Sequence, residues 1–293
     1  MNRDVAFCAL ALSVCGLLTW CFGALPLRAP VDASGLQMER ARWWRLWLPL
    51  CPAALALALL AGWAWQEPAR TDEIVRPLAL LTSVSVALVW ARAAWRAWRA
   101  LGAAHRLAAR TDAAVAVGLL RPRVVVGAAF RATIDDRALE AAVAHERAHV
   151  RHRDPLRLWL AQIATDLQWP AGAAGQRLGA WATALELARD EEARQQGVRG
   201  EDLASAIMSA LRLRCGRGGS GSGAAACLTG QEGALLVRLR RLLAPLPAPP
   251  SGAPERARGL GLALLLAALL VAGATVGLTH GDAVVRALPI VGT

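Results

Sequence analysis

The amino-acid sequence predicts a mainly α-helical membrane protein with four spans and one larger helical domain between the third and fourth. Of its 293 residues, 56% are hydrophobic and the mean hydropathy is +0.37, which is too apolar for an ordinary soluble domain. The apolar residues gather in four runs without charge in their central parts, each about long enough to cross a roughly 30 Å hydrocarbon core as a helix. The runs are Val5–Leu25, Leu46–Trp65, Ile74–Trp90 and Gly259–Leu278.

The distribution of charge predicts the orientation of these spans, because arginine-rich loops stay in the cytoplasm. The loop between the first two runs holds four arginines, whereas residues 66–73 hold three acids against one arginine. Residues 1–90 are therefore expected to form three transmembrane helices, and residues 91–258 a cytoplasmic domain. A fourth helix over 259–278 leads to a short external tail over 279–293, so both termini lie outside. We expect the first run to be a retained anchor, since it is long for a cleaved signal peptide.

The formal net charge of +11 is typical of nucleic-acid-binding proteins, but here the basic residues flank the apolar runs. They are expected to face an anionic lipid leaflet, so no direct nucleic-acid partner is predicted. The six cysteines do not form a disulfide framework. Four of them lie in apolar runs, and the other two lie in the predicted cytoplasmic domain, where thiols stay reduced.

The predicted cytoplasmic domain begins with a helix that continues from the third run to Arg110, with tryptophans placed as in an aromatic belt. Two short β-type runs follow, at Ala114–Val117 and Val124–Val126. The glycine and proline between them predict a small hairpin. Either its free edge pairs with an extended substrate peptide, or the hairpin is purely structural.

The strongest motif lies in the next predicted helix, for which Asp135 or Asp136 supplies the N-cap. His145, Glu146 and His149 form a His-Glu-x-x-His pattern. Residues i and i+4 share a helix face, so both imidazoles can bind one zinc ion. Glu146 can then act as the general base on a water at the same metal. The alternative is a surface helix whose histidines pair with acids.

Two further helices are predicted downstream, over Leu156–Leu167 and roughly Ala173–Gln195. The later one carries Glu186 and Asp190, which are four residues apart and share a helix face. This pair can supply the oxygen ligand that the histidine helix lacks and a carboxylate that supports a ligand. A solvated acidic face is the alternative. The domain ends in a flexible loop (216–223), a short basic amphipathic helix (Glu232–Leu243) and a proline-rich connector (245–254).

The order of hairpin, HERAH, Arg-Asp-Pro, Trp-Pro and ELARD resembles the BlaR/MecR-type membrane metallopeptidases, and this resemblance covers nearly the whole chain. It implies a gluzincin-like zinc peptidase domain that binds one Zn²⁺ per chain. It implies that the zinc ligands are His145, His149 and Glu186. It further implies that Glu146 is the general base and that Asp190 orients a ligand imidazole, expected to be that of His145.

Two features depart from the pattern of that family. Arg189 stands where family members commonly carry a cysteine, at a position that is not expected to bind the metal. The receptors of the family also carry a penicillin-binding sensor domain after the fourth span, and the sequence shows none there. Acylation by a β-lactam is therefore not predicted.

The sequence thus predicts a zinc-dependent endopeptidase of the bacterial cytoplasmic membrane. It is expected to be a regulatory signal transducer that cleaves a cytoplasmic repressor, or its own chain within Arg214–Arg258, where exposed backbone lies near the active site. The expected partners are the lipid bilayer and a protein or peptide substrate such as a winged-helix transcriptional repressor; the oligomeric state stays open. Two alternatives remain: a quality-control protease resembling HtpX, and a catalytically silent membrane receptor or scaffold.

Overall fold

The computed structural model describes residues 19, 21, 34–65, 77–109, 113–216, 232–246 and 254–287. These residues are mainly helical with one small sheet, which confirms that part of the predicted fold class. The first predicted span lies almost wholly outside the described residues. Among the helices that are described, none combines the length and the hydropathy that crossing a membrane requires. The four spans stay predictions.

The part of the chain before the sheet differs from the sequence expectation in two ways. A capping box between Ser34 and Gln37 starts a helix where a loop was expected. The second apolar run is interrupted by a short 3₁₀ turn around Pro49, which lacks the backbone donor that a continuous α-helix needs. The elements are α2 (Gly35–Trp47), the 3₁₀ turn η1 (Leu48–Leu50), α3 (Cys51–Ala64) and the long helix α4 (Pro77–Ala109).

The following segment contains the predicted hairpin and the two predicted helices that carry the candidate site. The two strands pair antiparallel, with Ala114 opposite Val126 and Val117 opposite Arg123, so the hairpin is confirmed. Asp135 caps the histidine helix, because its side chain accepts from the backbone N–H of Ala138 at 2.9 Å. The elements are β1 (Ala114–Val117), β2 (Arg123–Val126), α5 (Ala128–Thr133), α6 (Asp136–Arg151), α7 (Asp154–Leu167), α8 (Gly172–Gln195), α9 (Gly200–Gly216), α11 (Glu232–Leu243) and α12 (Pro254–Ala287).

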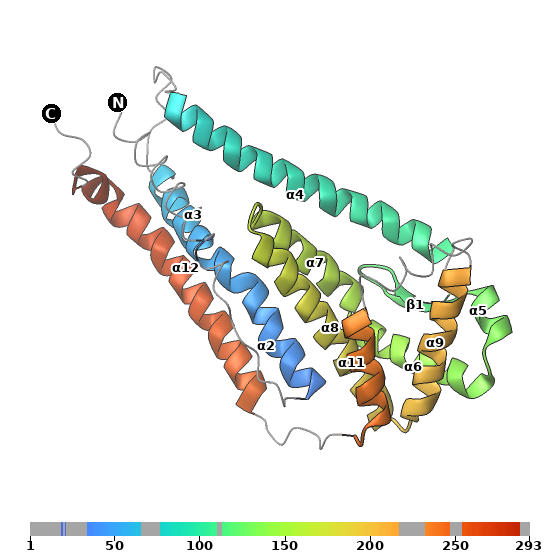
Figure 1. The fold of residues 1–293 in the computed structure, drawn as a ribbon. Helices are drawn as coiled ribbons and strands as arrows, with labels where there is room; N and C mark the ends of the chain where they lie inside the picture. The colour runs from blue at the N-terminus through green and yellow to red at the C-terminus, as the bar shows by residue number, and fades with distance from the viewer. Residues whose placement is uncertain are drawn as a thin grey trace.

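Helix α8 is the centre of the helical domain, with α2 along one side and α6, α7 and α11 against the others (Figure 1). Trp181 of α8 is fully buried with Leu46 of α2 and Ala161 of α7. A further cluster joins α6, α8, α9 and α11 through Ala141, Ala193, Leu203 and Leu242. These apolar contacts fix α6 and α8 side by side, and both carry candidate site residues.

Two more contacts join the long helices to this arrangement. The arginines Arg92 and Arg96 of α4 both pair with the buried Asp166 of α7, at 3.0 and 2.8 Å. On the opposite side in Figure 1, α3 packs along α12. A Cβ on Gly62 of α3 would lie 2.2 Å from the carbonyl oxygen of Ala274, so only glycine permits this close approach.

Candidate metal centre

Three side chains from α6 and α8 converge on one point. His145 and His149 lie one turn apart on α6, are both buried, and place their Nε2 atoms 3.0 Å apart. The carboxylate of Glu186 on α8 lies 3.4 Å from Nε2 of His145 and 3.6 Å from Nε2 of His149. Two ligands at the usual zinc distances are about 3.3 Å apart in a tetrahedral site. The donor spacing of this group therefore suits a zinc ion.

The electrostatics of the group favour a cation at the same point. Burial lowers the pKa of His145, but the carboxylates of Asp190 and Glu186 outweigh burial and raise it to about 10. Burial raises the pKa of Glu186, but Arg238 and the two histidines hold it well below its usual range. Two imidazoles and one carboxylate form the donor set of catalytic zinc sites that keep a position open for water. The residues present therefore fit a catalytic zinc ion.

Each of the two histidines has a buried carboxylate next to its Nδ1 atom, the ring nitrogen that does not face the candidate metal position. Asp190 Oδ1 lies 2.9 Å from Nδ1 of His145, as an ion-pair contact without the alignment of a hydrogen bond. Asp154 Oδ2 lies 2.9 Å from Nδ1 of His149 and is hydrogen-bonded to it. Contacts of this kind fix the ring so that Nε2 stays available to a metal.

Each of these two aspartates is in turn held by an arginine. Arg238 on α11 donates to both oxygens of Asp190 at 2.8 Å, and its Nη1 lies 2.8 Å from Glu186 Oε2. Arg189 on α8 donates to both oxygens of Asp154. Each buried aspartate is therefore paired with an arginine, which reduces the cost of burying its charge.

Glu146 lies beside the three candidate ligands. Its Oε2 accepts a hydrogen bond of 2.7 Å from the backbone N–H of Ala116 in β1. Burial raises the pKa of Glu146, and the opposing charges of His145 and His149 do not cancel this effect. A carboxyl group whose pKa moves toward neutrality is better suited to accept and return a proton.

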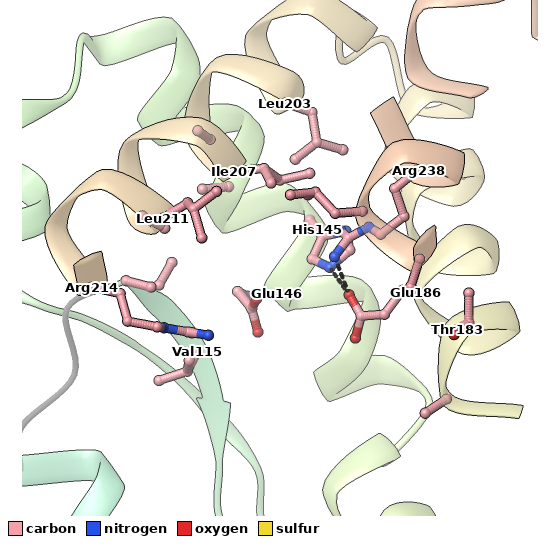
Figure 2. Close-up of a pocket in the computed structure, with 18 of the residues that line it drawn as sticks. Val115, His145, Glu146, Thr183, Glu186, Leu203, Ile207, Leu211, Arg214 and Arg238 are labelled. Atoms are coloured by element: carbon pink, nitrogen blue, oxygen red, sulfur yellow. Dashed lines mark ion pairs between the residues drawn. The ribbon is translucent and has the colours of Figure 1, made fainter. Parts of the chain in front are cut away.

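A cavity of about 900 Å³ lies in front of these residues and is lined by β1, α6, α8, α9 and α11. Figure 2 shows Glu146 between the α9 side chains Ile207 and Leu211 on one side and Glu186 on the other. The α9 wall is apolar from Leu203 to Leu211 and ends in Arg214, whereas the opposite wall carries Arg238. The cavity is large enough for several residues of a peptide.

A His-Glu-x-x-His helix, a carboxylate from a second helix and an edge strand beside the base define a candidate metallopeptidase centre. Residues 74–196 match the model of the family described as BlaR1 peptidase M56. This match supports a relationship of the matched region to the BlaR/M56 family, which implies a metallopeptidase. It covers less than half of the chain; it includes both histidines and Glu186 but ends before Arg238. The comparisons with curated proteins and with solved structures found no match.

The structure brings together all five residues that the sequence singled out. His145, His149 and Glu186 converge, Glu146 lies beside them, and Asp190 contacts His145 as expected. Sequence reasoning missed the roles of three others: Asp154 contacts His149, Arg189 contacts Asp154, and Arg238 contacts both Asp190 and Glu186. A signal was present for Asp154, since an acid five residues after the second histidine begins the next helix. The two arginines act across the fold and carry no local signal.

Proposed function

We propose that this protein is a membrane-anchored, zinc-dependent endopeptidase with a regulatory role. The observation that carries the proposal is the convergence of His145, His149 and Glu186, with Glu146 beside them, at the wall of a large cavity. A zinc ion held by these three residues would acidify a water molecule and polarise the scissile carbonyl group.

The residues of the chain supply the remaining chemistry. Glu146 takes the proton of the attacking water and then delivers it to the leaving amine. Its carboxylate is oriented for this by the N–H of Ala116. The carbonyl of Ala113, just before β1, accepts from the N–H of Gly127, just after β2. Backbone groups alternate sides along a strand, so the N–H of Ala116 points to the other edge of β1, where Glu146 accepts it. An extended peptide added to this edge would bring its backbone beside the base.

The cavity supports a preference for peptides with apolar side chains near the cleaved bond. Leu203, Ile207 and Leu211 of α9 line one wall, so burying an apolar side chain there removes apolar surface from water. A charged side chain beside these three residues would lose its hydration without an adjacent charged partner, since the one charged residue that α9 contributes to the described cavity lining is Arg214 at its C-terminal end.

The peptidase activity is tested by incubating the full-length protein with a peptide mixture and identifying the products by mass spectrometry. Wild type is expected to cleave beside apolar residues, and Glu146→Gln to lose at least about 100-fold in rate, because an amide cannot accept the proton. Glu140→Gln is the matched control, since Glu140 lies exposed on the same helix. Cleavage by Glu146→Gln at the wild-type rate would overturn the assignment.

In the proposed regulatory role, the protein lies in the cytoplasmic membrane with its zinc domain in the cytoplasm. It cleaves either a repressor or its own chain. This role is supported by the apolar runs, the arginine distribution and the family match. Wild type and Glu146→Gln are expressed in membranes with a tag at each terminus, together with a tagged winged-helix repressor. Fragments that need Glu146 support the role; equal fragments in both samples indicate another protease.

A further inference from the structure

Arg189 is an almost completely buried arginine beside the candidate metal centre. Its side chain is 1% exposed, and arginine is rarely buried unless it is paired. Its buried partner is Asp154: Nη2 of Arg189 donates to Oδ1 at 3.0 Å, and Nε donates to Oδ2, while Nη1 reaches Glu192 at 3.3 Å. This two-point contact fixes the plane of the carboxylate as well as its position.

The Asp154 oxygen that accepts from Nε of Arg189 is also the oxygen that contacts the candidate ligand His149. Asp154 Oδ2 is hydrogen-bonded to Nδ1 of His149 at 2.9 Å. Arg157 also reaches Asp154, but only at Oδ1, and it pairs in addition with Glu39 of α2. The position of Oδ2 therefore depends on Arg189 rather than on Arg157.

We propose that Arg189 is a positioning residue of the metal centre, which fixes Asp154 and thereby holds the His149 ring with Nε2 turned toward His145 and Glu186. The proposal rests on the proposed function, because it assigns Arg189 a role at the zinc site. With Nδ1 donating to a fixed carboxylate, His149 keeps the tautomer whose Nε2 lone pair is free for a metal. A carboxylate that could rotate would let the ring turn as well.

The test compares zinc dissociation constants of the full-length protein, measured by competition with a chelator. Arg189→Met is expected to weaken zinc binding about tenfold, a typical effect of losing a residue that supports a ligand. Arg189→Lys should lie between wild type and Arg189→Met, because lysine keeps the charge but not the two-point geometry. Arg151→Ala is the matched control, since Arg151 shares the partner Glu192 with Arg189 but does not touch Asp154.

Thermal unfolding of the metal-free proteins shows which variants fold. If Arg189→Met does not fold, the zinc dissociation constant of Arg189→Lys tests the proposal. A lower melting temperature with unchanged zinc affinity would mean a purely structural role and would overturn the proposal. Equal losses in Arg151→Ala and Arg189→Met would place the effect at Glu192 and overturn it too. The visible spectrum of the Co²⁺-loaded protein should change in the Arg189 variants alone. Wild type that binds no zinc would instead overturn the proposed function.

Discussion

Nη1 of Arg238 lies 2.8 Å from Oε2 of Glu186, so a residue of α11 holds a candidate metal ligand of α8. The same guanidinium pairs with Asp190, whose side chain is 4% exposed. The candidate centre is therefore complete only when α11 is packed in place. The helix lies beyond residues 217–231, which are outside the described part of the chain.

Arg238→Ala is expected to destabilise the protein and to impair cleavage. Removing one partner of a buried ion pair leaves a charge uncompensated and typically costs about 3–5 kcal/mol. Arg240→Ala is the matched control, because Arg240 is exposed on the same helix. Thermal unfolding of the metal-free proteins checks the prediction. Equal melting temperatures for both variants would show that Arg238 does not hold the two carboxylates.

Gly200→Ala is expected to displace α11 through a backbone clash. Gly200 is the first residue of α9, and a Cβ there would lie 1.9 Å from the carbonyl oxygen of Leu242 in α11. The helix must shift, which we expect to cost about 1–3 kcal/mol in unfolding free energy. Gly175→Ala is the control, since its Cβ would meet no atom within 4 Å. A Gly200→Ala protein as stable as the control would argue against this packing of α9 and α11.

Glu192→Gln tests the electrostatics behind the histidine helix. Burial raises the pKa of Glu192, but His152 and Arg151 outweigh it and lower the pKa from 4.5 to about 2. A carboxylate whose pKa is lower in the folded state stabilises the folded protein at any pH above its unfolded-state pKa. This stabilisation is lost as the pH falls toward the folded-state pKa. The free energy of unfolding of the wild type should therefore exceed that of Glu192→Gln by about 1 kcal/mol or less at neutral pH.

The difference between wild type and Glu192→Gln should shrink between pH 4.5 and pH 2, as measured by chemical unfolding at each pH. Glu201→Gln serves as the control, because the side chain of Glu201 is 70% exposed and its pair with Arg199 is screened by water. A difference that grows as the pH falls would contradict the assigned direction of the pKa shift.

Local patterns predicted the parts of the site that lie within one helix. The four-residue spacing placed His145 with His149, and it placed Glu186 with Asp190. Local residue types also indicated the aspartate cap of α6 and, through two β-type runs with a glycine and a proline between them, the hairpin before it. These features depend on residues close in sequence, where helix and turn geometry alone decide which side chains meet.

The contacts that hold the site together were not predictable in the same way. Arg238 reaches Asp190 over 48 positions in sequence, and Arg189 reaches Asp154 over 35. Helix α2 was missed because the segment lies between two apolar runs and was taken as their connecting loop, although its side chains Met38 and Leu46 are buried. Helix α9 carries Leu203, Ile207 and Leu211 at helical spacing, a signal that was present but not used.

The zinc content of purified variants tests the central claim most directly. Wild type and Glu146→Gln should each hold about one zinc per chain, because Glu146 is a base and not a ligand. His145→Ala and His149→Ala should hold almost none, since each removes one of three protein ligands. Normal zinc content in either histidine variant would contradict the metal centre described here, and with it the assignment as a zinc peptidase.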